Sequence, residues 1–465
     1  NRVPVDTILM AGRAATILLA ALFGAAIAWW TRRRYGDGAG LLAVALCCFD
    51  PNLMAHGRYV TTDFPVTVFY FFTCVLWIDY LETNRARLLS AAAVTFALAL
   101  VTKFSAVLLI PTLPVLYVAA WIRNPREFPL RRLAVAGGAL AAAVFVIVNI
   151  VYWPETLRCL RQHPGPLAPA VDRNDFVGSA LYFFGSKLHL PAHRFFLGLN
   201  ALAEHNAGGH ASYLLGLRSD TGWWYYFPVV FAVKSTIAAL IATVIALALG
   251  IRARMFGLLF PPVLYFVVSM TSGINIGVRH ILPVYPFLYV AAAAALARLP
   301  LRRAAAFAML GLGVLQIGEF ASISPDYLAF FNALSGGPGN GPHYLVDSNI
   351  DWGQDVKKLV HWLDTHGTRK AYVCYFGNAQ LRYYGVDENG LPPALDRQGW
   401  EQVNGYVVAN VTPLNGVYVP LADLASLRLR EPIAKVGWSM YVYDFRKAGS
   451  TAAAPDSVLP APRSQ

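Results

Sequence analysis

The feature that most constrains this chain is a series of ten apolar runs, most of them long enough to cross a lipid bilayer. A hydrocarbon core of roughly 30 Å requires about 20 apolar residues per helix. Backbone in lipid must also satisfy its own hydrogen bonds, so the runs predict an all-α polytopic membrane bundle with about ten transmembrane helices. The runs cover residues 8–31, 39–56, 64–82, 88–102, 104–121, 132–153, 228–250, 255–271, 281–297 and 303–321.

Composition supports the same class. Hydrophobic residues make up 57% of the 465 residues and charged residues only 14%. The formal net charge of +12 would also suit a protein that binds nucleic acid, but most of the arginines lie in short loops between the apolar runs. Membrane topology therefore explains the basic charge, and we expect no nucleic-acid partner.

Arginines gather in every second loop. The opposite short turns carry only Arg58, Lys103 and Arg279 as basic residues. By the positive-inside rule the arginine-rich side faces the cytoplasm, so both ends of the chain are expected outside it. The fourteen arginines on the predicted inner side are Arg32, Arg33, Arg34, Arg85, Arg87, Arg123, Arg126, Arg131, Arg132, Arg252, Arg254, Arg298, Arg302 and Arg303.

Two stretches are too polar to span a membrane. We expect residues 1–321 to form a transmembrane domain with an extracytoplasmic loop at 154–227, and residues 322–446 to form a small extracytoplasmic α/β domain. The Ala/Pro/Ser-rich tail at 447–465 is predicted to be disordered.

The C-terminal domain shows two kinds of periodicity. Residues 355–366 have helical spacing, whereas 370–376, 405–411 and 440–445 are rich in β-branched and aromatic residues, as strands are. Neither a metal-binding His/Cys motif nor a phosphate-binding glycine loop occurs in the chain.

His56, Arg58 and Asp63 lie in a short polar break between two apolar runs. Charges at that depth are usually functional, because an isolated Arg–Asp pair beside uncharged helices is costly without a ligand or a purpose. The alternative is an interfacial charge pair that closes a helical hairpin.

Lys103 and Lys234 are both expected near the outer membrane boundary, Lys234 some six residues inside its helix. Either lysine alone would be explained by a side chain that reaches up to the interface. Two lysines facing the same leaflet favour an anion site, since a lipid-linked phosphate needs fixed cations.

Arg279 and His280 occupy the predicted outward turn before the ninth apolar run. Arginine suits phosphate and histidine can exchange a proton. Pro283 and Pro286 would break the helix entry beside a cavity, although a simple capping turn is the alternative.

A fourth polar group lies in the long loop. Its aromatic residues suit an interfacial belt, a wall for sugar rings or a polyprenyl chain, or both. The candidate substrate-binding residues in this loop are His205, Asn206, His210, Tyr213, Trp223 and Trp224. The acidic run from Asp347 to Asp355 is also expected on the outer side. The alternative to a functional role is that this run caps a helix and docks the C-terminal domain.

Five strings resemble, in order, bacterial membrane glycosyltransferases of family 39, relatives of protein O-mannosyltransferases and of the lipid A aminoarabinose transferase. They are HGRYVTTD at 56–63, VTK at 101–103, GHASYLLG with GWW at 209–224, GVRHILP at 277–283 and DSNIDWGQD at 347–355.

The resemblance implies a GT-C fold in the bacterial inner (cytoplasmic) membrane, with the active site at its outer face. It implies an inverting transfer of a hexosyl or pentosyl group from a polyprenyl-phosphate carrier to an acceptor hydroxyl of a protein, lipid or glycan. Asp63 and Arg58 then match the second carboxylate site, and Lys103, Lys234, Arg279 and His280 match the phosphate clamp. His56 joins the substrate-binding residues.

The family's principal base lies in an outer loop after the first membrane helix. Because this sequence begins at Asn1 beyond that loop, we expect the base in an upstream portion. Carboxylates near Asp63 would suit a divalent cation, although no motif requires one. The alternative function is a non-enzymatic transporter or flippase of a lipid-linked sugar, whose polar residues would lie near the bilayer midplane instead of at one face.

Overall fold

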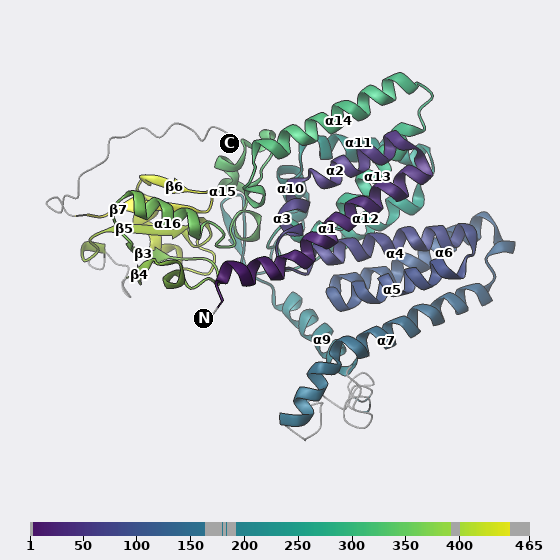
Figure 1. Cartoon of the computed structure of the whole chain (residues 1–465), viewed down its shortest axis with the longest axis horizontal. Helices are drawn as coiled ribbons and strands as arrows, with labels where there is room; N and C mark the ends of the chain where they lie inside the picture. Colours follow the sequence, from purple (N-terminus) through teal and green to yellow (C-terminus); the bar gives the residue numbers. More distant parts are fainter. Residues whose placement is uncertain (1–2, 163–178, 180–182, 184–191, 392–399, 447–465) are drawn as a thin grey trace. The chain divides into compact units, whose positions relative to one another are not determined.

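The computed structural model describes residues 3–162, 179, 183, 192–391 and 400–446, and it divides into two compact units (Figure 1). The first unit consists of residues 1–210 and 223–327, and the second of residues 211–222 and 328–465. The predicted disordered tail at 447–465 lies outside the described residues.

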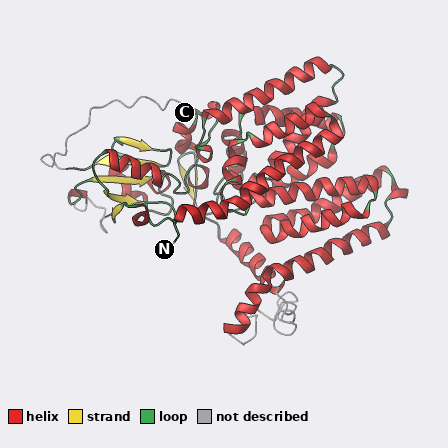
Figure 2. Cartoon of the chain, in the orientation of Figure 1, coloured by secondary structure: helices red, strands yellow, loops and turns green. Residues whose placement is uncertain are grey.

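The first unit is helical (Figure 2). Its helix α4 packs against α5 and α6, and α5 also packs against α7 (Figure 1). Short 3-10 turns, η1 (Phe104–Leu108) and η4 (Val278–Ile281), precede α6 and α13. The helices are α1 (Val5–Tyr35), α2 (Asp37–Cys48), α3 (Pro51–Gly57), α4 (Asp63–Thr83), α5 (Ala86–Thr102), α6 (Leu109–Arg123), α7 (Leu130–Gln162), α9 (Ala192–Gly208), α10 (Tyr226–Lys234), α11 (Ile237–Arg252), α12 (Phe256–Ser269), α13 (Val284–Ala297) and α14 (Arg302–Ser322).

Every predicted apolar run is helical. Among the described residues, five helical segments are long and apolar enough to cross a membrane, or seven if each of two bent helix pairs counts as one span. The remaining runs form α5, α12 and α13, which have 17, 14 and 14 residues. The predicted class of polytopic helical membrane protein is confirmed, whereas the count of ten spans stays a prediction.

Two apolar runs that the sequence predicts as continuous helices are each divided into two helices. Helices α2 and α3 meet at 65°, and α10 and α11 meet at 118°. The first break has a local cause, because Pro51 starts α3 and the Asp50 carboxylate accepts a hydrogen bond from Leu53 N at 2.9 Å. At the second break, the Thr236 hydroxyl caps α11 by accepting from Ala239 N at 3.0 Å.

Helix α14 satisfies backbone groups at both breaks. Its Glu319 carboxylate accepts hydrogen bonds from Ile237 N at 2.9 Å and Ala238 N at 3.2 Å, at the start of α11. Its buried Gln316 donates to Phe49 O at 3.0 Å, beside the α2–α3 break. Since a helix end in lipid has no water to bond, these side chains allow the two helices to break inside the bundle.

The second unit contains a five-stranded sheet of order β4-β3-β5-β7-β6. Strands β4, β3 and β5 are parallel, whereas β7 is antiparallel to both β5 and β6. The strands are β3 (Lys370–Cys374), β4 (Asp387–Asn389), β5 (Tyr406–Asn410), β6 (Ala434–Val436) and β7 (Met440–Asp444). The predicted small α/β domain is therefore confirmed, although the two edge strands β4 and β6 were not predicted.

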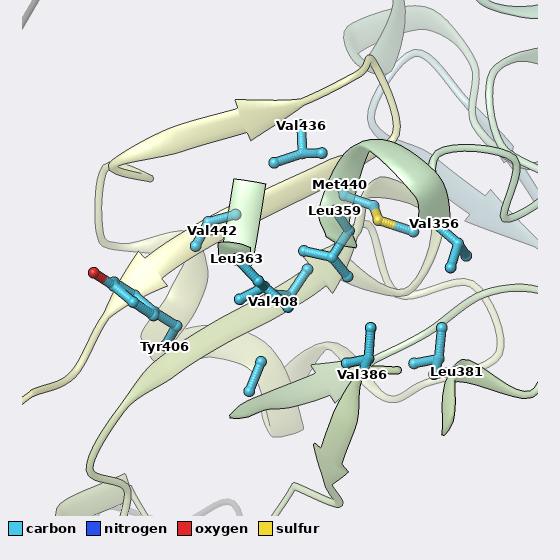
Figure 3. Packing of buried hydrophobic residues seen from close by; sticks show 11 residues of the cluster. Val356, Leu359, Leu363, Leu381, Val386, Tyr406, Val408, Val436, Met440 and Val442 are labelled. Atoms are coloured by element: carbon cyan, nitrogen blue, oxygen red, sulfur yellow. The ribbon is translucent and has the colours of Figure 1, made fainter. Parts of the chain in front are cut away.

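One helix covers a face of this sheet. Leu359 and Leu363 of α16 (Val356–Thr365) are one helical turn apart and pack onto Val408 and Val442 (Figure 3). The shorter elements of the unit are β1 (Ser212–Leu214), β2 (Leu217–Ser219), α15 (Gly341–Tyr344), α18 (Val411–Leu414) and α19 (Ala425–Arg428). Residues 211–222 thus belong to this unit, whereas the sequence analysis assigned the whole loop 154–227 to the membrane domain.

Candidate functional site

Asp63 is the centre of a cluster of cations in the first unit. It is the first residue of α4 and is only 3% exposed. The Lys103 ammonium donates a hydrogen bond to Asp63, with 2.5 Å between Nζ and Oδ1. The Arg279 Nη1 atom lies 4.0 Å from the other carboxylate oxygen, Oδ2. The structure thus joins three residues that the sequence analysis assigned to three separate clusters.

The chain direction explains this meeting. Helices α4 and α5 form a hairpin, so the first residue of α4 and the residue after α5 lie at the same end of the bundle (Figure 1). Lys103 is the C-cap of α5, where the helix dipole favours a cation. Arg279 is brought to the same end by η4, which precedes α13.

Two histidines complete the cluster. His56 is fully buried in α3, and the charges of Asp63, Arg279 and Lys103 act on it. His280 lies next to Arg279, and the ring of Phe227 is 6.2 Å from its own. A buried carboxylate among two cations and two imidazoles can bind an anion and exchange a proton.

Arg58 has different partners from the expected one. Its guanidinium lies over the rings of Tyr59 and Tyr327, 5.3 and 5.2 Å from their centroids. In the described part of the chain, Asp63 pairs with Lys103 instead of with Arg58. The predicted Arg58–Asp63 pair is therefore corrected, because the aromatic rings hold Arg58 by cation–π contacts.

Lys234 stands at the break between α10 and α11. It is fully buried and ends α10, whereas the sequence analysis expected it inside a continuous helix. Its carbonyl accepts a hydrogen bond from the Asn52 amide at 2.7 Å. Asp50, which also accepts a hydrogen bond from the Tyr289 hydroxyl at 2.5 Å, is a carboxylate whose charge acts on Lys234.

Sequence reasoning missed Asp50, Gln316 and Glu319 as residues that shape this region. Asp50 occupies the polar break that the sequence does show, so its position was a usable signal. Gln316 and Glu319 lie inside an apolar run, and polar residues within a membrane helix are themselves a signal of internal contacts.

The loop histidines lie together. The Nε2 atom of His205 is 3.3 Å from Nδ1 of His210, and the two rings are stacked. The Asn206 side-chain oxygen accepts hydrogen bonds from the Ser272 hydroxyl at 2.9 Å and from Gly273 N at 3.1 Å. These bonds hold Asn206 against the turn at Ser272 and Gly273, a few residues before Arg279.

The three aromatic candidate residues belong to different units and have different environments. Trp223 donates its backbone N–H to Asn275 at 2.7 Å, and Trp224 is 69% exposed. Tyr213 is buried in β1 of the second unit. Their roles as substrate-binding residues stay predictions.

The acidic run of the second unit forms internal contacts. Asp351 is fully buried and accepts hydrogen bonds from Gly353 N, the Asn410 amide and the Thr412 hydroxyl. Burial raises the pKa of Asp351 to about 7, although these donors oppose the shift. Asp355 occupies the N-cap position of α16 but does not cap it through its side chain; it bonds the Ser439 hydroxyl at 2.8 Å.

No group of three or more His, Cys, Asp or Glu side chains that could hold a metal ion occurs among the residues that the structure describes. The described residues therefore provide no ligand set for the divalent cation considered near Asp63.

A family match covers about the first third of the chain. Residues 7–153 match the family model described as dolichyl-phosphate-mannose-protein mannosyltransferase. This region contains His56, Arg58, Asp63 and Lys103. No curated protein sequence matches the chain.

Two solved structures are similar to this one at 13% sequence identity. A crystal structure of ArnT from Cupriavidus metallidurans bound to undecaprenyl phosphate has a TM-score of 0.46, covering 93% of this chain and 83% of that one. The apo state of the same ArnT has a TM-score of 0.44, with coverages of 92% and 82%. The family match at residues 7–153, the region that holds Asp63 and Lys103, confirms the resemblance of this part of the chain to the membrane mannosyltransferase family.

Proposed function

We propose that this chain is a glycosyltransferase that moves a hexosyl or pentosyl group from a polyprenyl-phosphate carrier to an acceptor hydroxyl. The observation that carries the proposal is the buried Asp63 carboxylate with Lys103 and Arg279 beside it. Asp63 and Lys103 both lie within the residues that match the mannosyltransferase family.

The reaction needs a carboxylate and fixed cations. The acceptor hydroxyl loses its proton to a carboxylate while its oxygen forms a bond to the anomeric carbon. The bond from that carbon to the lipid phosphate breaks on the opposite face, which inverts the sugar. The phosphate leaves with both electrons of that bond, so cations at its oxygens stabilise the transition state.

The ion pair suggests how Asp63 and Lys103 share this work. A phosphate that enters the cluster competes with Asp63 for Lys103, because both are oxyanions that the ammonium can bond. Transfer of Lys103 to the phosphate leaves the Asp63 carboxylate able to receive a proton. Asp63 then receives the proton of the acceptor hydroxyl, or assists another carboxylate that receives it.

The distribution of the arginines supports an outward orientation of the proposed site. The Asp63 cluster lies at the end of α4 opposite to the arginine-rich loops, which the positive-inside rule assigns to the cytoplasm. The proposed site therefore faces outward from the bacterial inner membrane. Membrane lipid surrounds it, and the acceptor is a protein, a lipid or a glycan.

The second candidate function is transport of the same lipid-linked sugar. A transporter typically binds its substrate near the bilayer midplane at broken helices. The α10–α11 break with its buried Lys234 is an observation of that kind. Asp63, Lys103 and Arg279, in contrast, gather at one end of α4, which favours the enzyme.

The test is transfer of radiolabelled sugar from synthetic polyprenyl-phosphate donors in liposomes that contain the chain. Transfer to any supplied acceptor hydroxyl, together with release of polyprenyl phosphate, would support the enzyme and identify the sugar class. Movement of the intact donor across the bilayer without release of polyprenyl phosphate would contradict the enzyme function and support the transporter function.

A further inference from the structure

The membrane unit contains a second polar site, at the other end of α4 from Asp63. A cavity of about 270 Å³ lies among the last turns of α1, α4 and α6, the start of α12 and the residue after α13. Its volume is slightly below the roughly 300–1,000 Å³ that ligand pockets have.

Four arginines from separate segments line this cavity: Arg34 in α1, Arg123 in α6, Arg254 between α11 and α12, and Arg298 after α13. Glu82 is the one carboxylate residue among the lining residues. The lining therefore has an excess of positive charge.

Two of these arginines are held by the protein. Arg34 pairs with Asp79 and, through Nη2 at 2.6 Å, with Glu82. Arg298 lies over the Tyr35 ring, 5.3 Å from its centroid. In the part of the chain that the structure describes, Arg123 and Arg254 have no carboxylate within ion-pair distance, so their charges are available to a ligand.

The backbone of Arg254 adopts a conformation that favours glycine. Its φ angle is +54°, and it follows the C-cap of α11. Glycine is the usual residue at such a helix end, because a Cβ atom disfavours the left-handed region. An arginine here accepts local strain and brings a guanidinium to the cavity.

The rest of the cavity wall is apolar. Trp30, Leu81 and Leu116 line it from α1, α4 and α6, and Met255 and Leu258 line it from the start of α12. Free phosphate or a soluble metabolite would make few contacts with this wall, whereas acyl chains would pack against it by van der Waals contacts.

We propose that this cavity binds an anionic phospholipid, with the phosphate at Arg123 and Arg254 and the first part of the acyl chains against the apolar wall. Guanidinium groups bond phosphate oxygens in pairs, and basic pockets between membrane helices suit anionic head groups. The site is distinct from the proposed donor site, because α4 has 21 residues and so separates the two by about 30 Å.

The alternative is that these arginines only set the membrane topology. A matched variant distinguishes the two, because Arg126 and Arg252 lie within three residues of Arg123 and Arg254 in the sequence but do not line the cavity. The Arg123→Gln/Arg254→Gln and Arg126→Gln/Arg252→Gln variants remove equal charge from the same end of the bundle.

The experiment titrates dioleoylphosphatidylglycerol onto the full chain in an uncharged detergent and counts bound lipid by native mass spectrometry. We expect the cavity variant to bind about tenfold more weakly or worse, and the matched variant to bind within about twofold of the wild type. Ala120→Phe is a second variant that keeps every arginine and fills the cavity, and it should weaken binding as well.

Two further ligands identify the source of the phosphate. Dioleoylphosphatidylcholine has the same tails without net charge, and glycerol 1-phosphate has the anion without tails. We expect the first to bind at least about tenfold more weakly and the second to leave phosphatidylglycerol in place. Equal losses in the two arginine variants, unchanged binding in Ala120→Phe, tight phosphatidylcholine binding, or displacement by glycerol 1-phosphate would each overturn the proposal.

Discussion

The Lys103 ammonium bonds the Asp63 carboxylate across the α4–α5 hairpin, with 2.5 Å between Nζ and Oδ1 and 40 positions between the residues in the sequence. Asp63 is 3% exposed, so neither its charge nor its bond to Lys103 is screened well by water. The pair therefore links the stability of the hairpin to the chemistry proposed at its end.

Removal of Lys103 should destabilise the membrane unit. Among the described residues, Lys103→Met leaves the buried Asp63 carboxylate with Arg279 as its remaining cation, 4.0 Å away, and a broken buried pair typically costs about 3–5 kcal/mol. We expect a clear drop in the thermal unfolding midpoint of the detergent-purified chain.

The double variant Asp63→Asn/Lys103→Met is the control for that prediction. It removes both charges, so most of the lost stability should return while sugar transfer stays low. A single variant as stable as the wild type would show that the pair does not hold the hairpin.

Glu319 should be needed for the break between α10 and α11. Its carboxylate accepts from Ile237 N and Ala238 N, and an unsatisfied buried N–H costs about 1–3 kcal/mol. Glu319→Ala should therefore lower the unfolding temperature more than Glu319→Gln, which keeps one acceptor oxygen. Equal effects of the two substitutions would contradict this role.

Gly353 should tolerate no side chain. Its φ angle is +67°, and a Cβ atom would collide with the Tyr375 hydroxyl and lie 2.8 Å from Phe376 O. Gly353→Ala should lower the unfolding transition of the second unit, measured by scanning calorimetry of the full chain. Gly390→Ala is the matched control, because a Cβ atom there meets nothing within 4 Å; an equal effect of both would refute the argument.

Asp351 should make the second unit less stable as the pH rises. Burial raises its pKa to about 7 in the folded state from an ordinary 3.8, so the unfolded chain releases this proton first. The contribution is full below about pH 4, declines as the pH rises, and is lost above about pH 7. The same calorimetric transition should show this decline in the wild type, and Asp351→Asn should flatten it; an unchanged slope in the variant would assign the titration elsewhere.

The helices were the most predictable part of the fold. Apolar runs such as 64–82 and 303–321 must be helical in lipid, and they are. The α10–α11 break was harder to predict than the α2–α3 break at Asp50 and Pro51. Only Lys234, Ser235 and Thr236 interrupt the apolar run at 228–250, and the groups that satisfy the exposed backbone come from α14. Strands β4 and β6 have three residues each, which is too short for an alternating pattern to emerge.

The candidate site was predictable residue by residue but not as an arrangement. Asp63, Lys103 and Arg279 stand out as charges beside apolar runs. Their pairing depends on how α4, α5 and η4 pack, so sequence order suggested Arg58 as the partner of Asp63 while the structure gives Lys103.

The most direct test of the proposed site is the rate of sugar transfer in liposomes by Asp63→Asn, compared with Asp37→Asn. Asp37 is an ion-paired carboxylate as well, but it is 82% exposed and bonds Arg32, away from the Asp63 cluster. Loss of a carboxylate that receives the proton typically reduces the rate about 10²–10⁴-fold, and we predict such a loss for Asp63→Asn alone. Transfer at the wild-type rate by a folded Asp63→Asn variant would contradict the account.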